Sequence, residues 1–168
     1  MSRTLGIDPG TATMGFGVVD AAGNQLRAVQ FGVWTTSSTD ALPYRLRALH
    51  EHMVELIEST QPSAVAVESL FFNRNVRTAL SVGQARGIAL LAAAQANLEV
   101  HEYTPQQVKD AVVGYGKASK EQVQIMIKTL LGLATVPKPD DAADALAISI
   151  CHLHSARIAR LTQSLPRL

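Results

Sequence analysis

Over the first 35 residues, apolar positions fall in short runs separated by glycine-rich breaks, a pattern typical of β-strands. Strands are expected at residues 4–8, 15–20 and 26–35. The segment Ala22-Gly23-Asn24 between the second and third is a strong hairpin signal. Short connections join antiparallel neighbours, so the chain is predicted to open with three successive antiparallel strands.

Beyond residue 40, apolar residues recur at helical spacing, interrupted by two short strands. The strand expected at 64–68 lacks alternation, as a strand covered on both faces does. Thr104 and Ser119 are predicted N-caps, and Pro105 fits the first position of a helix. Together these elements predict an α/β domain. The expected helices are 41–59, 76–97, 105–113, 120–131 and about 140–160, and the second short strand is 99–103.

Length and composition favour one globular domain spanning residues 1–168. The chain has no apolar run of 18 residues and no apolar stretch at its N-terminus, so we expect neither a membrane span nor a signal peptide. The single cysteine, Cys151, cannot form an internal disulfide, which fits a reducing, cytoplasmic setting.

The net charge of +1 is unevenly distributed. Residues 1–72 carry 4 basic and 7 acidic side chains, a net of −3, whereas residues 73–138 carry 8 basic and 4 acidic side chains, a net of +4. Such a distribution suits a protein that binds a polyanion beside a carboxylate pocket. An ordinary solvated surface is the alternative, and charge alone favours it.

Two acids stand at the ends of apolar strands. Asp8 precedes the turn Pro9-Gly10, and Glu68 ends the strand 64–68. A buried carboxylate is costly unless a cation or hydrogen-bond donors meet it. Asp8 could simply satisfy the amides of its turn, or it could be the first ligand of a metal or phosphate site.

Two further acids lie three residues apart on the last helix and therefore share a face. Asp140 or Asp141 could cap this helix, but capping does not account for Asp144, which stands among alanines and aliphatic residues. Two carboxylates on one apolar face repel each other unless a cation holds them. We therefore group Asp141 and Asp144 with the two strand-end acids.

Four oxygen ligands of this kind suit Mg²⁺ or Mn²⁺, whereas the chain has too few cysteines and histidines for zinc. Carboxylates holding two ions ~3.5–4 Å apart support in-line attack of water on a phosphodiester. A nearby lysine can neutralise charge in the transition state. Lys120 is a candidate because it opposes the dipole of its helix, although a solvated lysine is equally compatible with the sequence.

Two other features leave alternatives open. Phe71 and Phe72 are adjacent in a loop, where they form either a core anchor with a lid residue or a platform for stacking bases. Gly83 and Gly87 lie four apart on the long helix 76–97, which is apolar on more than one face. This helix is either packed in the core or shared with a second copy of the chain.

Six sequence blocks resemble, in order, those of the RuvC-type Holliday junction resolvases, which are ribonuclease H-like nucleases. The resemblance covers nearly the whole chain. The blocks are GIDPG with the following G-x-G, VES-x-FF-x-x-N, GQARG, YTPQQVK, VVGYGKASK and DDAADALAISICHLH.

The resemblance implies a mixed five-stranded sheet of three antiparallel and then parallel strands, flanked by helices. It places the family's four metal-binding carboxylates at Asp8, Glu68, Asp141 and Asp144, and Asp140 matches no catalytic position. Lys109 and Lys120 match the family's basic residues that support cleavage, and Phe71 matches its base-stacking aromatic residue. The remaining expected DNA-binding residues are Phe72, Arg74, Arg77 and Lys117.

The implied activity is symmetric, paired nicking of a four-way DNA junction by a homodimer with two Mg²⁺ ions per site, for which Mn²⁺ is a possible substitute. The nicks leave 5′-phosphate ends. The family's partnership with the RuvA–RuvB branch-migration complex is implied as well. The glycines behind Asp8 are interpreted as hairpin geometry that lets DNA approach.

Two rival functions remain at this point. Actin-like ATPases and sugar kinases also begin with an aspartate and a glycine-rich turn, but they need a second such domain. A scaffold that binds junctions without cutting them is the other rival, and the complete set of four acids argues against it.

Overall fold

The computed structural model describes residues 2–69 and 76–163, except for the side chains of residues 76–78. All expected helices and strands are present, and their bounds differ from the predicted ones by three residues at most. The elements are β1 (Ser2–Asp8), β2 (Thr13–Ala22), β3 (Gln25–Thr35), α1 (Leu42–Thr60), β4 (Ala64–Glu68), α2 (Val76–Gln95), β5 (Glu99–Tyr103), α3 (Pro105–Val113), α4 (Lys120–Leu130) and α5 (Asp140–Gln163).

The five strands form one mixed sheet in the order β3-β2-β1-β4-β5. β1, β2 and β3 pair antiparallel, as predicted, and β4 pairs parallel with both β1 and β5. The parallel pairs need crossover connections, which α1 and α2 supply. β4 is buried along its length up to Glu68, which confirms that both its faces are covered.

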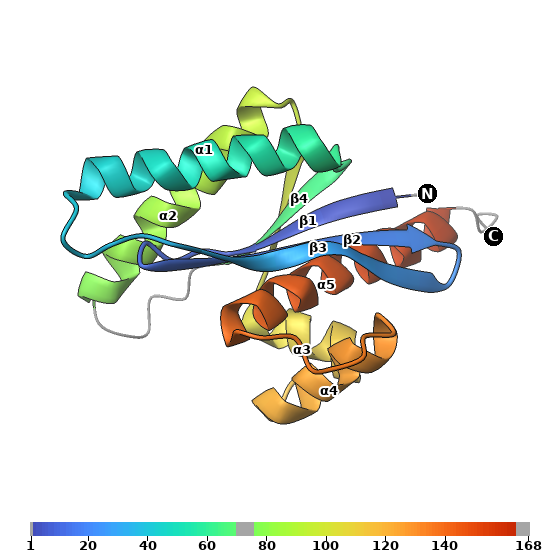
Figure 1. Cartoon of the computed structure of the whole chain (residues 1–168). Coiled ribbons are helices and arrows are strands. Elements are labelled where there is room, and N and C mark those ends of the chain that lie inside the picture. Colours follow the sequence, from blue (N-terminus) through green and yellow to red (C-terminus); the bar gives the residue numbers. More distant parts are fainter. Residues whose placement is uncertain (1, 70–75, 164–168) are drawn as a thin grey trace.

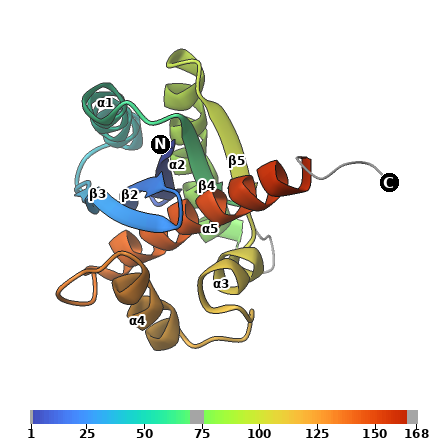
Figure 2. The same ribbon diagram turned by 90° about the vertical axis from the view of Figure 1, so that its right-hand side faces the viewer.

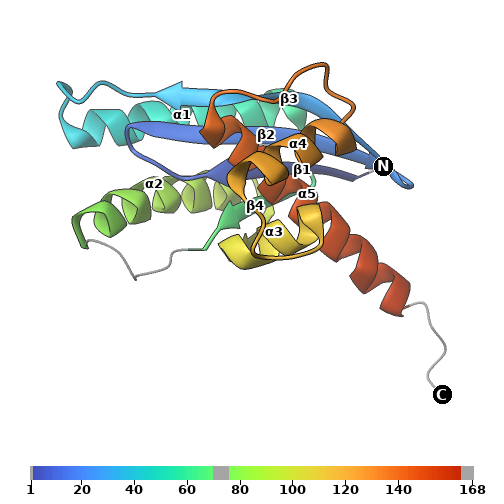
Figure 3. The ribbon, with the colours of Figure 1, turned by 90° about the horizontal axis from the view of Figure 1, so that it is seen from below.

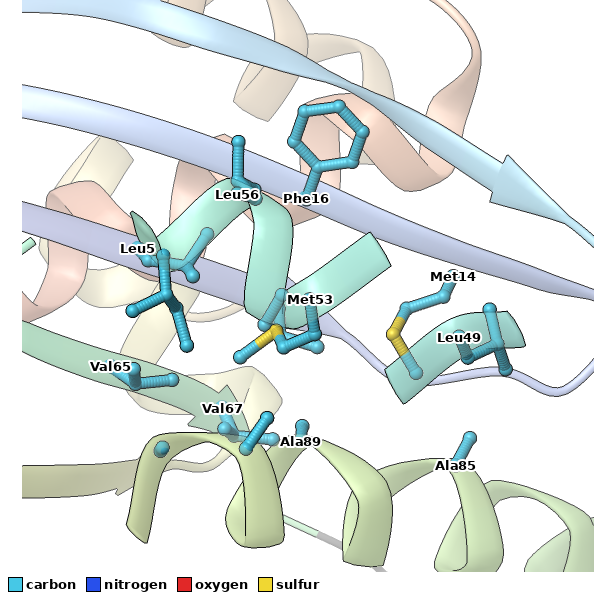
Figure 4. Packing of buried hydrophobic residues seen from close by; sticks show 14 of the residues in the cluster. Leu5, Met14, Phe16, Leu49, Met53, Leu56, Val65, Val67, Ala85 and Ala89 are labelled. Atoms are coloured by element: carbon cyan, nitrogen blue, oxygen red, sulfur yellow. The ribbon is translucent and has the colours of Figure 1, made fainter. Parts of the chain in front are cut away.

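Helices cover both faces of the sheet (Figure 1). α1 and α2 lie on one face, where Leu49 and Met53 of α1 and Ala85 and Ala89 of α2 pack against β1, β2 and β4. Figure 4 shows this cluster from close by, with Ala89 of α2 beside Val67 of β4 and Ala85 further along the helix, below Leu49 of α1. The alanines let α2 approach the sheet closely.

The second face is covered by α5, with α3 and α4 packed outside it, as the turned view shows (Figure 2). α5 is buried almost continuously from Ala142 to Leu153. Beyond these residues its last turns extend past the sheet and are exposed (Figure 3). Both α3 and α4 begin with a capping box, at Thr104 and Ser119 respectively, which confirms the two predicted N-caps.

No helix in the described parts of the chain is long and apolar enough to cross a membrane.

Candidate active site

The first two acids of the site come from neighbouring parallel strands. Asp8 is the last residue of β1 and Glu68 is the last residue of β4. The register pairs Ile7 with Val67, so both strands end at the same edge of the sheet. Since parallel neighbours place their carboxyl ends together, Asp8 and Glu68 are brought side by side by strand pairing alone.

The other two acids arrive on α5, which lies directly on the sheet because three glycines leave room for it. A Cβ at Gly6 would stand 2.2 Å from the Ala145 carbonyl oxygen. A Cβ at Gly17 would stand 2.8 Å from the Leu146 backbone nitrogen. The Ser149 hydroxyl also donates a 2.7 Å hydrogen bond to the Gly17 carbonyl oxygen. The helix backbone thus rests against the strand backbone.

Gly15 completes this contact beside the first acid. It pairs with Asp8 across the β1–β2 ladder, and a Cβ there would stand 2.1 Å from the carbonyl oxygen of Asp141. Our expectation that these glycines form hairpin geometry for DNA is therefore wrong for Gly15. It lies inside β2, which begins at Thr13, and its lack of a side chain lets the backbone of α5 pack against the strand. This contact brings the start of α5 to the end of β1.

The convergence of the acids is visible in their electrostatics. Burial, together with the charges of Glu68, Asp144 and Asp141, raises the pKa of Asp8 to about 7 against the opposing charge of Lys120. Burial also raises the pKa of Glu68, with a contribution from Asp144. Carboxyl groups that raise one another's pKa in this way are a mark of functional sites.

The pKa of Asp144 is raised by burial, and its hydrogen bond from Lys120 opposes that shift. The Lys120 ammonium lies 3.1 Å from Asp144 Oδ2 and 3.3 Å from Asp140 Oδ2. Burial lowers the pKa of Lys120, but its hydrogen bonds to Asp144 and Asp140 outweigh that effect and raise it. Lys120 is thus a fixed positive charge at the rim of the acid cluster.

The donor set fits a hard divalent cation, because every member is a carboxylate and all four come from one edge of the sheet and the start of α5. Within residues 2–69 and 76–163, however, no three carboxylate, imidazole or thiol groups converge closely enough to hold an ion as they stand. Lys120 pairs with Asp144 in this arrangement, so a cation bound by Asp144 would compete with the lysine for that carboxylate.

A cleft of about 230 Å³ opens beside the acids. Lys109 of α3 and Lys120 of α4 stand at its rim together with Glu68 and Asp144. Its floor is apolar, formed by Pro105, Val108, Val123, Ala147 and Ile148. Two lysines and two acids that line one cleft suit a phosphodiester strand, because the lysines can neutralise its charge beside the acids.

The structure thus brings together Asp8, Glu68, Asp144 and Lys120, whose charges act on one another's pKa values. Asp141 is close enough to raise the pKa of Asp8. Lys109 lines the same cleft as Glu68 and Asp144. Lys117 is exposed in the connection between α3 and α4. Phe71, Phe72 and Arg74 lie outside the described residues, and Arg77 lies in α2 with its side chain outside them.

Sequence reasoning missed a role for Asp140, which was set apart as matching no catalytic position. Asp140 Oδ1 accepts hydrogen bonds from Gln124 at 2.9 Å and from Lys138 at 3.1 Å, and Asp140 Oδ2 pairs with Lys120. These bonds lower the pKa of Asp140 to about 2. The lysine two residues before it was the available signal.

Comparison with known proteins agrees with this geometry. The family model described as "Crossover junction endodeoxyribonuclease RuvC" matches residues 4–152. The chain belongs to the RuvC family of crossover junction endodeoxyribonucleases. A RuvC from Rubrobacter xylanophilus is 60% identical over 158 residues, covering 94% of this chain and 88% of its own. The RuvC of Desulfitobacterium hafniense is 57% identical over 154 residues, covering 92% and 93%.

Among solved structures, Thermus thermophilus RuvC in complex with a Holliday junction substrate superposes with a TM-score of 0.91 at 39% identity, covering 95% of this chain and 97% of its own. The yeast mitochondrial Holliday junction resolvase Ydc2 superposes with a TM-score of 0.69 at 17% identity, covering 97% and 81%. The second likeness concerns the fold alone. These matches confirm the RuvC resemblance and the ribonuclease H-like fold.

Proposed function

We propose that this RuvC-family chain resolves four-way DNA junctions by hydrolysing phosphodiester bonds at the edge of its sheet, in recombination and DNA repair. The observation that carries the proposal is the convergence of Asp8, Glu68 and Asp144 where β1, β4 and α5 meet: burial raises all three pKa values, and the charge of Asp144 raises those of Asp8 and Glu68. Burying several carboxylates together destabilises a folded protein unless they bind cations. Residues 1–168 act as a single nuclease domain in this proposal.

The proposed ligands are the carboxylates of Asp8, Glu68, Asp141 and Asp144, and the proposed cofactor is two Mg²⁺ ions per site, with Mn²⁺ as a substitute. When bound, such ions activate the attacking water and stabilise the leaving 3′ oxygen, so that cleavage leaves 5′-phosphate ends. The hard oxygen ligands and the absence of cysteine from the cluster support this choice.

The lysines of the cleft bind and orient the DNA strand in this proposal. Lys109 and Lys120 line the cleft together with Glu68 and Asp144, so a phosphate bound by the lysines would lie beside the acids. Further DNA contacts are proposed for Phe71, Phe72, Arg74, Arg77 and Lys117, which belong to the loop before α2, the start of α2 and the connection between α3 and α4.

The proposed active form is a homodimer joined through α2. Leu80 is 64% exposed and Leu91 is 49% exposed, so two large apolar side chains of this helix are available for contact with a second copy. Between them, Gly87 is exposed and a Cβ there would meet nothing within 4 Å. A second copy packed on this face would give two sites related by two-fold symmetry, which suits paired nicks in strands of like polarity.

The proposal extends to the RuvA–RuvB branch-migration complex as a partner on the junction, by family membership. The reduced, buried thiol of Cys151 fits a cytoplasmic location.

The decisive experiment incubates the full chain and Mg²⁺ with a labelled synthetic four-way junction. The wild type is expected to nick two opposed strands symmetrically. Asp8→Asn is expected to bind the junction with unchanged affinity and to cut at least about 10²-fold more slowly, the scale of losing one preorganised charged group. Glu121→Gln, which removes an exposed acid from the first turn of α4, is the matched control. ATP hydrolysis without action on the junction would refute the nuclease function.

A further inference from the structure

Asp140 is tied to the proposed catalytic lysine by a network that sequence comparison did not assign. It is the first residue of α5, and its carboxylate faces two lysines and a glutamine. Gln124, whose amide donates the 2.9 Å bond, is 7% exposed and comes from the middle of α4. A buried amide fixes the Asp140 carboxylate in direction, and that carboxylate in turn meets the Lys120 ammonium.

The Lys120 ammonium is shared between two acids of different surroundings. Asp144 is a proposed ligand in the half-buried cluster, whereas the Asp140 side chain is 47% exposed and lies at the rim. If a divalent cation takes the Asp144 carboxylate, an ammonium bound to Asp144 alone would lose its only carboxylate partner. With Asp140 at 3.3 Å, Lys120 keeps one.

We propose that Asp140 is a positioning residue for Lys120, holding its ammonium beside the cleft while the Asp144 carboxylate turns to a divalent cation. The proposal rests on the proposed function, in which Asp144 is a ligand and Lys120 meets the DNA phosphate. Asp140 then acts at both steps. It lowers the cost of releasing Asp144, and it keeps the lysine oriented at the rim of the cleft where the strand lies.

Two plainer roles for Asp140 have to be separated from this one. An acid in the first turn of α5 also stabilises the helix dipole, and its negative charge attracts any nearby cation through space. Asn at position 140 has nearly the same shape and retains the ability to accept a hydrogen bond from Gln124. Neither the dipole effect nor the through-space attraction depends on Lys120, so a background without the lysine distinguishes them.

The test is a double-mutant cycle with Asp140→Asn, Lys120→Met and the double variant, all as full-length chains. The first readout is the affinity for Mn²⁺ without DNA, measured by calorimetry. We expect Asp140→Asn to weaken Mn²⁺ binding about threefold to tenfold when Lys120 is present, and by less than about twofold in the Lys120→Met background, since contacting residues couple on this scale. The sign follows because the lysine loses its alternative partner.

The second readout is single-turnover cleavage of a four-way junction at saturating Mn²⁺, together with junction affinity. Asp140→Asn is expected to lower the rate about tenfold with unchanged affinity, and to lower it no further in the Lys120→Met background. Lys128→Met, which removes a positive charge from the last turn of α4, is the control. It should change both readouts by less than about twofold.

An effect of Asp140→Asn that is equal in both backgrounds, or absent from both, overturns the proposal. The first result would mean that Asp140 acts through its charge alone. Failure of the proposed function is recognised separately, because the cleavage rates of Asp8→Asn and the wild type on the four-way junction would then be the same, whether both cut it or neither does. The Mn²⁺-binding cycle is measured without DNA and does not depend on cleavage.

Discussion

Gly15 lies against the backbone of Asp141, so closely that a Cβ at position 15 would stand 2.1 Å from the Asp141 carbonyl oxygen. The same glycine is the ladder partner of Asp8. The separation between an acid of the sheet and an acid of the helix is therefore set by backbone packing at a single point. Larger side chains at this point would move the helix away from the strand.

Gly15→Ala is predicted to impair catalysis more than it impairs folding. The added methyl group must displace the start of α5, which costs about 1–3 kcal/mol of stability for an overpacked site. A displaced Asp141 should slow junction cleavage by more than about tenfold, since misplacing a group by 1 Å can cost 10²-fold. Urea unfolding and single-turnover cleavage measure the two effects.

Gly32→Ala is the matched control for this prediction. Gly32 lies on the neighbouring strand β3, where a Cβ would meet only the ring edge of Phe16, at 3.1 Å. It should leave the cleavage rate within about twofold, because the new contact is with the far end of the Phe16 side chain and Gly32 lies on a strand that carries none of the four acids. Equal losses of cleavage in both variants would contradict a specific role for the Gly15 contact.

Asp8→Asn is predicted to stabilise the cation-free protein at alkaline pH. The folded-state pKa of Asp8 is about 7, well above the ordinary 3.8. Between these values the folded state binds the extra proton, so the wild type loses stability as pH rises from about 4 to about 7. The variant lacks this titration and should melt several degrees higher than the wild type at pH 8 in EDTA, at ~2–4 °C per kcal/mol for a chain of this size.

Asp20 offers a comparison of opposite sign. Arg3 donates hydrogen bonds of 2.7 and 2.9 Å to the Asp20 carboxylate and lowers its pKa. The stability that Asp20 contributes is present above its unfolded pKa and is lost as pH falls through the folded value. Asp20→Asn should therefore lower the melting temperature at pH 8. If Asp8→Asn also lowered the melting temperature at pH 8, the raised pKa of Asp8 would be refuted.

Leu91→Glu is predicted to convert the proposed dimer into a monomer. In the dimer, the second copy would cover this face of α2 and bury the new carboxylate without a partner. Sedimentation equilibrium should show the halved mass, and paired nicking of the junction should become single, slow nicking. Ile125→Glu places the same charge on α4 at a residue that is 59% exposed. A dimeric Leu91→Glu, or a monomeric Ile125→Glu, would place the interface elsewhere.

Lys109→Met is predicted to slow cleavage about 10- to 100-fold, because it removes one of the two positive charges at the rim of the cleft. The salt dependence of junction binding should also become less steep by about one phosphate contact. Lys128→Met, in the last turn of α4, is the control and should leave the cleavage rate unchanged. A normal rate for Lys109→Met would remove this lysine from the proposed site.

The sequence predicted the elements well because their signals are local. Thr104 and Ser119 cap their helices through their own side chains, and β4 is buried on both faces, which its unbroken apolar run already indicates. The meeting of Asp8 and Glu68 could also be foreseen, since both end strands of one sheet. Their nearness to α5 could not be derived from periodicity: the four acids were grouped because each is costly without a cation, and the family resemblance then placed them in one site.

What the sequence did not reveal depends on contacts between distant segments. Gly15 and Gly17 alternate along β2, which indicates that another backbone approaches one face, but not which one. Asp140 looked like a helix cap, and only the fold brings Gln124 and Lys120 to it. Side-chain networks between helices depend on helix packing, and for that reason local patterns do not encode them.

The docking of α5 on the glycines of β1 and β2 ties the acid cluster to a helix that follows all five strands in the chain. Asp8 and Glu68 are synthesised well before Asp141 and Asp144. A chain without α5 holds only two of the four proposed ligands and lacks a cover for one face of its sheet. Folding and the proposed metal site therefore depend on the same helix.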